Sequence, residues 1–226
     1  MAELIVTIDG PAASGKSTAA RLLARKLGAS FLDTGAMYRA VTLAAIQAGA
    51  DLSDQKQLLE VMEKSEFQFT AGDDQMEVGV DGNDVTEQLR HPKITAAARY
   101  IAVAPKARQK LVRMQRQFAA GQKKIVTEGR DQGTVAFADA DIKFFLIAEP
   151  GERARRRQAE LLAKGVNEPL EQIRRAIEER DKSDESRSAG PLKPAEDAII
   201  VDTTNLTIEE VVDKLLGFVT EKCLKN

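Results

Sequence analysis

The most constraining feature of the chain is the stretch GPAASGKST, which begins at residue 10. It completes the pattern G-x-x-x-x-G-K-[S/T], with Gly10, Gly15, Lys16 and Ser17 at the defining positions. The β-branched run ELIVTIDG leads into the pattern, and an amphipathic stretch with a helical repeat follows it. A strand, this loop and a helix in succession predict an anion-binding loop within an α/β fold.

The residue types of this loop suit phosphate groups. Successive backbone N–H groups turn inward around an anion, and the helix N-terminus adds partial positive charge. We expect Lys16 to reach the β- and γ-phosphates of a nucleotide and the Ser17 hydroxyl to bind Mg²⁺. The residues expected to hold the donor phosphates are Gly10, Pro11, Ala12, Ala13, Ser14, Gly15, Lys16, Ser17 and Thr18. Phosphate binding alone leaves a switch GTPase, a motor, a transporter ATPase and a small-molecule kinase open.

Strand and helix signals alternate along most of the chain, which predicts a parallel sheet covered by helices on both faces. We expect strands within 3–10, 29–35, 123–129, 142–149 and 199–204. We expect helices within 17–27, 36–49, 51–65, 91–104, 105–121, 150–165, 168–187 and 207–223. From 66 to 90, alternating apolar and polar residues around Gly and Asp turns predict a small antiparallel β insertion. The polar segment 130–141 is expected to be a loop.

Composition narrows the range of partners. The 226 residues include 33 basic and 35 acidic side chains, a net charge of −2, so a general nucleic-acid binder is not expected. No apolar run approaches the length of a membrane span, and the N-terminal segment lacks the basic start of a signal peptide. The single cysteine, Cys223, fits a reducing compartment, and we expect a cytoplasmic protein with one core and insertions.

Arginine clusters favour the kinase among the open classes. A kinase must surround the transferring phosphoryl group with cations, and guanidinium groups match phosphate oxygens. Two clusters lie in charged helical segments: Arg153, Arg156 and Arg157, and Arg180, Asp184 and Arg187. Taken singly, each is equally well explained as a solvated helix face balanced by glutamates. A third group follows an apolar strand: Glu128, Arg130 and Asp131. Glu128, at the strand end, is a candidate to orient Mg²⁺.

Several segments, in order, resemble the bacterial cytidylate (CMP) kinases: TIDGPAASGKST, FLDTGAMYR, EGRDQGT, ERDKSDESR and GPLKPAEDAIIVDTT. The resemblance covers nearly the whole chain. Its P-loop is generic, whereas DTGAMYR together with GRDxGTxxF is specific to that family among nucleoside monophosphate kinases. The resemblance implies a three-layer P-loop NTPase-type fold, ATP as donor, Mg²⁺, and transfer of the γ-phosphoryl group to CMP and dCMP. The implied divisions are a core of 1–36, 92–150 and 168–226, a monophosphate-binding region of 37–91, and a helical lid of 151–167.

The resemblance also implies roles for single residues. The implied acceptor-site residues are Thr34, Tyr38, Arg39, Arg108, Gly129, Arg130, Asp131, Arg180, Asp184 and Arg187. On the donor side, Arg156 joins the P-loop in binding ATP, and Arg153 and Arg157 belong to the lid. The implied catalytic residues are Lys16, Arg130, Arg153, Arg157 and Arg187, and the implied metal-binding residues are Ser17 and Glu128.

Asp131 is implied to read the base, and hydrogen-bond chemistry agrees. Cytosine presents its N4 amino group as a donor, which a carboxylate accepts, whereas uracil presents the acceptor O4 at that position. One position departs from the family pattern: Arg99 stands where a serine is usual, which leaves the preference between CMP and dCMP open.

Two kinds of alternative remain. One is a kinase for another small acceptor such as UMP or shikimate, although Asp131 and the sugar-binding set argue against shikimate. The other is an ATP-hydrolysing switch protein, for which a G-protein base motif would be expected, and the chain holds no Asn-Lys-x-Asp. We expect small-molecule nucleotides as partners, no nucleic acid or membrane, and a monomer.

Overall fold

The computed structural model describes residues 2–72, 75–163 and 165–224. Within these ranges, five strands form a central parallel sheet in the order β2-β6-β1-β7-β8. The strands are β1 (Leu4–Asp9), β2 (Ser30–Asp33), β6 (Lys124–Gly129), β7 (Ile142–Ile147) and β8 (Ile199–Asp202). The three middle strands are almost entirely buried, which explains their near-continuous apolar runs.

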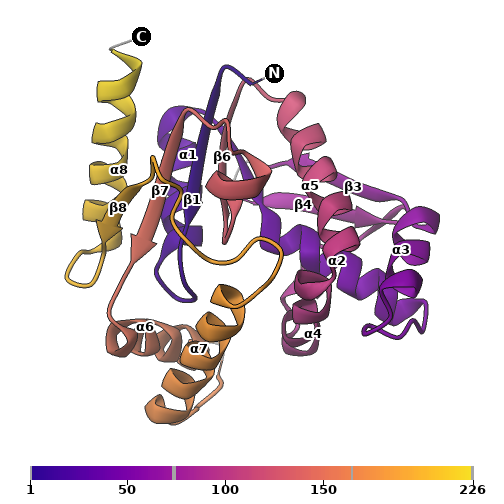
Figure 1. Ribbon diagram of the computed structural model, residues 1–226. Helices are drawn as coiled ribbons and strands as arrows, with labels where there is room; N and C mark the ends of the chain where they lie inside the picture. The colour runs from indigo at the N-terminus through magenta and orange to yellow at the C-terminus, as the bar shows by residue number, and fades with distance from the viewer. Residues whose placement is uncertain (1, 73–74, 164, 225–226) are drawn as a thin grey trace.

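Helices cover both faces of this sheet and complete a three-layer fold (Figure 1). One face packs against α1 and α8, around Leu23 and Phe144. The other packs against α2, α4 and α5, around Met37 and Ile125, with α3 beside them. The helices are α1 (Lys16–Leu27), α2 (Thr34–Gln47), α3 (Gln55–Lys64), α4 (Pro92–Val103), α5 (Pro105–Ala120) and α8 (Ile208–Cys223). The predicted parallel sheet with helices on both faces is therefore confirmed.

A second, antiparallel sheet lies beside α2 and is built by the predicted β insertion. Its strands are β3 (Phe67–Ala71), β4 (Met76–Val80) and β5 (Asn83–Asp84), followed by the short turn η1 (Gln88–Arg90). Asp81 and Gly82 both have positive φ, 51° and 77°, as the favoured two-residue hairpin turn requires. The buried side chains of Met76, Val78 and Val80 join the same core as α2. The insertion is thus packed against the main core and confirms the prediction.

The segment expected to be an irregular loop instead contains the π-helical turn η2 (Gln132–Ala136). The carbonyl oxygen of Asp131 accepts the N–H groups of both Val135 and Ala136, at 2.9 and 3.2 Å. Wide turns of this kind are rare and carry no sequence signature, so the polar composition alone did not predict it.

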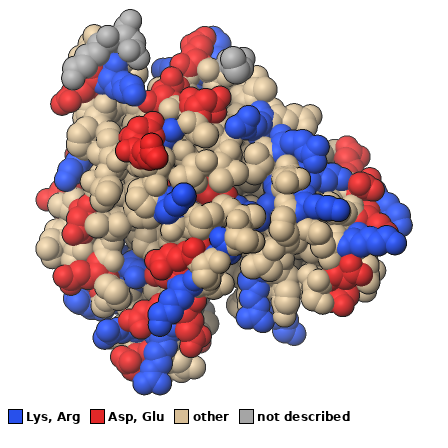
Figure 2. All heavy atoms as spheres, viewed as in Figure 1, with Lys and Arg blue, Asp and Glu red and all other residues tan. Residues whose placement is uncertain are grey.

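Two charged helices, α6 (Pro150–Leu162) and α7 (Leu170–Glu185), pack together at the end of the sheet toward which β7 runs (Figure 1). Their outer faces carry mixed charge, and acidic and basic side chains lie side by side there (Figure 2). Arg174 and Glu178 pair at 2.9 Å, one helical turn apart. Part of the charge on these helices therefore serves solvated faces. None of the helices in the described ranges is long and apolar enough to cross a bilayer.

Candidate active site

The P-loop follows β1 at the carboxyl edge of the sheet, where the neighbouring strands also end. Asp9, the last residue of β1, lies opposite Gly129 of β6, and Asp33, the last residue of β2, lies opposite Glu128. Gly10 has a φ of 152°, and a Cβ at this position would overlap the carbonyl oxygen of Leu146. The turn out of β1 therefore requires glycine, and it leads directly into the loop that precedes α1.

Lys16 is buried at the start of α1, and its Nζ donates to the carbonyl oxygen of Pro11 at 3.0 Å. Burial, with a further contribution from Arg130, lowers the pKa of Lys16 to about 7, and Glu128 opposes the shift. A bound polyphosphate would add negative charge here and favour the protonated amine. The Lys16 amine is thus held in place, and the negative charge of a bound phosphate group would stabilise its protonated form. This is expected of a phosphate-binding lysine.

Glu128 and Ser17 supply two oxygen groups next to Lys16. Burial raises the pKa of the Glu128 carboxyl, while Lys16 and a hydrogen bond with Ser17 lower it. Thr34 fixes the end of β6 by donating its Oγ1 hydrogen to the Glu128 carbonyl oxygen at 2.7 Å. Helix α2 starts at this threonine, two residues before its expected start, because the Asp33 side chain caps it. Across the described residues, no group of three or more His, Cys, Asp or Glu forms a ready-made metal site.

An arginine cluster faces the carboxyl edge of the sheet. The Nε of Arg130 donates to the Asp184 carboxylate at 2.7 Å, and Arg187 lies 3.4 Å from its other oxygen. Burial would raise the pKa of Asp184, but Arg130 and Arg187 outweigh it and hold the pKa below its usual value. Arg180, on the same helix, is exposed, and its charge acts on Lys16. The Arg130–Asp184 pair therefore joins the end of β6 to α7.

Two buried nitrogen atoms in this part of the molecule find no hydrogen-bond acceptor among the described residues. They are Nη2 of Arg187 and Nε of Arg39. Arg39 still pairs with Asp33 through its terminal nitrogen, at 3.2 Å. Buried polar groups are nearly always hydrogen-bonded in proteins, so these two donor atoms point to an anionic ligand, although Arg187 Nη2 also lies 3.4 Å from an Asp184 oxygen.

A second charged pair lies deeper in the site. The buried side chains of Arg108 and Asp131 form an ion pair, and Arg108 also donates to the Ala102 carbonyl oxygen at 3.2 Å. The Tyr38 ring lies 5.7 Å from the Arg108 guanidinium carbon, in cation–π range. Burial raises the pKa of Asp131, and Arg108 is the strongest opposing influence. The pair can therefore offer a planar ligand both an acceptor and a donor.

Gly190 closes over this pair, and its replacement is expected to damage the site. It has a φ of 61°, and a Cβ there would overlap both Asp131 Oδ2 and Arg108 Nη2. Because misplacing a substrate-contacting group by ~1 Å costs about 10²-fold, we expect Gly190→Ala to lower kcat/KM by about that factor. Gly49→Ala is the matched control, since Gly49 has a φ of 66° and open space around it. Steady-state kinetics of both variants checks this, and equal losses would contradict it.

The three lid arginines predicted to act together lie in different environments. Arg153 is buried at the base of α6, where it pairs with Asp181 and donates to the carbonyl oxygens of Ala12 and Ala148 at 3.1 and 3.0 Å. The other oxygen of Asp181 accepts the N–H of Ala12 at 3.0 Å. Arg157 instead pairs with Glu160 on the helix surface, at 2.9 Å. The buried pair thus binds α6 and α7 to the P-loop backbone.

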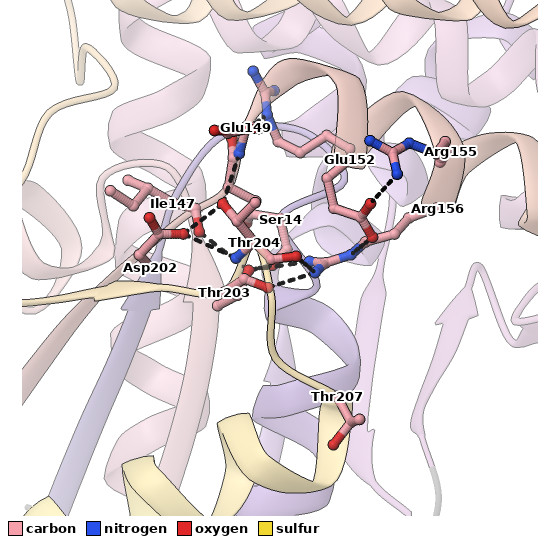
Figure 3. Close-up of polar contacts among 12 residues, drawn as sticks. Ser14, Ile147, Glu149, Glu152, Arg155, Arg156, Asp202, Thr203, Thr204 and Thr207 are labelled. Atoms are coloured by element: carbon pink, nitrogen blue, oxygen red, sulfur yellow. Dashed lines mark hydrogen bonds and ion pairs between the residues drawn. The ribbon is translucent and has the colours of Figure 1, made fainter.

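Arg156 borders a cavity on the outer side of the P-loop. Its guanidinium lies between Glu152 and the segment after β8, as Figure 3 shows, and donates to Thr203 Oγ1 at 3.0 Å and to the Thr203 carbonyl oxygen at 2.5 Å. The Thr203 hydroxyl also lies within hydrogen-bonding distance of the Ser14 carbonyl oxygen, at 3.2 Å. The adjoining cavity, about 250 Å³, is lined by Gly15, Thr18, Arg156, Thr203, Leu206 and Ile208.

Sequence reasoning identified most residues of this region but missed three. Asp9, Gly190 and Thr203 lie within segments that carry the family resemblance, but no role was predicted for them, although Thr203 follows a strand at the edge where ligands bind in α/β folds. The predicted residues of the P-loop, the β6 end and α7 all meet at that edge. Their individual roles stay predictions.

The site combines the P-loop, the arginine cluster around Asp184 and the charged helices α6 and α7. This combination defines a P-loop kinase that phosphorylates a small acceptor molecule. Residues 6–221 match the family model described as cytidylate kinase. The cytidylate kinase of Carboxydothermus hydrogenoformans is 44% identical over 217 residues, covering 96% of this chain and 97% of the relative. That of Limosilactobacillus reuteri is 46% identical over 213 residues, covering 94% and 93%. The chain belongs to the cytidylate kinase family.

A solved gluconokinase from Sinorhizobium meliloti 1021 has a similar fold. The match has a TM-score of 0.50 and 13% sequence identity, and it covers 97% of this chain and 93% of the other. At that identity the likeness concerns the fold alone, and it agrees with the three-layer architecture described above.

Proposed function

We propose that this protein transfers the γ-phosphoryl group of ATP to CMP, giving CDP and ADP, and that it also accepts dCMP. The observation that carries the proposal is the P-loop lysine with Arg130 and Arg180 around it on one side and the Arg108–Asp131 pair on the other. The first arrangement suits two phosphate-bearing ligands. The second suits a base with an amino donor, such as cytosine.

The chemistry requires positioning and charge more than covalent participation. Lys16 stabilises the charge on the transferring group, and Arg130 and Arg187 hold the acceptor phosphate in line with it. The attacking phosphate oxygen is already ionised at neutral pH, so no strong base is needed. Arg157 is assigned to the donor phosphates when the lid of 151–167 closes, whereas Arg153 acts from the base of the lid by holding Ala12.

Ser17 and Glu128 are the residues we assign to Mg²⁺. A hydroxyl and one carboxylate are hard oxygen ligands, and Mg²⁺ commonly takes one or two carboxylates and completes its shell with phosphate oxygens and water. Bound there, the ion would neutralise charge on the β- and γ-phosphates. Lys16 and Ser17 both lower the pKa of the Glu128 carboxyl, and this proximity supports the assignment.

The remaining assignments concern organisation. We assign 1–36, 92–150 and 168–226 to the core, 37–91 to the region that covers CMP, and 151–167 to the lid. The cavity bordered by Arg156 and Thr203 is assigned to the nucleoside part of ATP. We also propose that the enzyme acts as a monomer in the cytoplasm, on free nucleotides and not on nucleic acid.

ADP production from MgATP with CMP, dCMP, UMP, AMP or no acceptor tests the proposed function. We expect high turnover with CMP, low turnover with UMP and almost none without an acceptor. Equal rates with and without acceptor would instead identify an ATPase or switch protein. The ratio of dCMP to CMP turnover, compared between the wild type and Arg99→Ser, measures whether Arg99 alters sugar recognition.

A further inference from the structure

Asp9 is a buried carboxylate that the proposed mechanism does not use. It is the residue before Gly10, and it is 4% exposed. Its Oδ1 accepts the N–H of Gln132 at 2.9 Å, and its Oδ2 accepts the N–H of Gly133 at 2.8 Å. One side chain at the entrance to the P-loop therefore holds the two residues that follow Asp131.

The two amides that Asp9 binds need an external acceptor. They begin the short turn η2, and the first N–H groups of any helical turn have no partner within it. The rest of the segment is already engaged: the Gln132 side chain accepts from Thr127 Oγ1 at 3.0 Å, and the Asp131 carbonyl oxygen closes the turn. The position of the Asp131 backbone therefore depends on the Asp9 carboxylate.

A carboxylate at this position is costly, which argues that its two acceptor oxygens are needed. The pKa of Asp9 is raised to about 7, mainly by burial and also by Asp131, against the opposing effects of the two amides and Arg130. A neutral asparagine would avoid most of this cost. Asparagine, however, has one acceptor oxygen and would turn its amide hydrogens toward the second N–H.

We propose that Asp9 is a positioning residue that fixes the 131–133 backbone and thereby aims the Asp131 carboxylate at the cytosine amino group. The proposal rests on the proposed function, because it assumes that Asp131 reads the base. In this assignment Asp9 acts through the backbone that it holds and not by binding a nucleotide. Its contribution is to set how well the enzyme distinguishes CMP from UMP.

Asp9→Asn tests this in the acceptor assay. Because a lost acceptor in a buried site costs about tenfold or more, we expect kcat/KM for CMP to fall by at least about tenfold. We expect kcat/KM for UMP to change less, so that the CMP-to-UMP ratio falls, and KM for ATP to stay within about twofold. Equal losses for CMP and UMP, or no loss at all, would overturn the proposal.

Asp141→Asn is the matched control. Asp141 also accepts a backbone N–H of β1, from Ile5 at 2.7 Å, but at the opposite end of the strand. Its replacement is expected to leave every kinetic constant unchanged. A wild type without CMP turnover would defeat the proposed function and not the role of Asp9, so the two failures are distinguishable.

A measurement on the wild type keeps the proposal testable if Asp9→Asn does not fold. Hydrogen exchange of the ligand-free protein should show slow exchange at the Gln132 and Gly133 amides, since both are buried and bonded to Asp9. Rapid exchange at these amides would overturn the proposal without any variant.

Discussion

Lys16→Met will lower kcat for CMP phosphorylation by about 10²–10³-fold, with a smaller change in KM for ATP. Methionine keeps an unbranched side chain that reaches as far as lysine Cε but lacks the charged amine, and Lys16 is buried with its amine held at the Pro11 carbonyl oxygen. Its charge is expected to act on the phosphoryl group during transfer more than on ATP at rest. Steady-state kinetics at saturating CMP and MgATP measures the effect.

Lys26→Met is the control for this variant. Lys26 lies on the same helix, but it is exposed and pairs with Asp213 at 2.6 Å, so its loss should leave kcat unchanged. A defect of Lys16→Met confined to KM for ATP would contradict the catalytic assignment. That result would mean that the lysine binds the donor equally in the ground state and in the transition state.

We also expect the Lys16→Met variant to remain folded, and the lowered pKa of Lys16 in the folded protein gives the reason. The folded-state pKa of about 7 lies below the ordinary value of 10.5 because burial disfavours the charged amine. Between these two pH values the unfolded chain binds a proton that the folded protein does not, so the free energy of unfolding rises with pH. At pH 7 the buried amine is therefore a cost, and its removal should not lower the thermal midpoint.

The sheet, its helices and the P-loop could be predicted because their signals are local. Apolar runs such as IKFFLIAE fill strands buried on both faces, and Asp81–Gly82 takes the backbone shape that its hairpin requires. Because neighbouring parallel strands end at the same edge of the sheet, the P-loop, Glu128 and Arg130 lie together there. This part of the site follows from chain order alone.

The rest of the site depends on contacts between residues far apart in the sequence. The spacing of Arg153, Arg156 and Arg157 suggested one shared face, but Arg153 is buried by its pairing with Asp181 while Arg157 stays near the surface. Periodicity describes one helix and says nothing about what packs against each position. Gly190 was missed for the same reason, because its need for a small side chain arises from Asp131 and Arg108.

Helix α7 links the two halves of the proposed reaction centre. Asp181 binds the P-loop backbone at Ala12, and Asp184 binds Arg130 on the acceptor side three residues later. These positions lie about one helical turn apart, so α7 holds donor-side and acceptor-side groups in a fixed relation. A displacement of α7 would therefore move both sets of contacts together.

Asp131→Asn will lower kcat/KM for CMP by about 10²–10³-fold and the CMP-to-UMP ratio by at least about tenfold. Two losses combine in this variant. The base loses a carboxylate acceptor for its amino group, and the buried Arg108 guanidinium loses its ion-pair partner. UMP cannot use the carboxylate in the wild type, so its kcat/KM should fall less.

The comparison variant is Asp139→Asn, eight residues further along the same loop region. Asp139 is exposed and lies 3.9 Å from Arg116, so its neutralisation should leave both acceptors unaffected. Asp131→Asn with an unchanged CMP-to-UMP ratio would remove Asp131 from base recognition, even if both rates fell. In that case the Arg108–Asp131 pair would hold the fold together, and base selectivity would have to come from other groups around Tyr38.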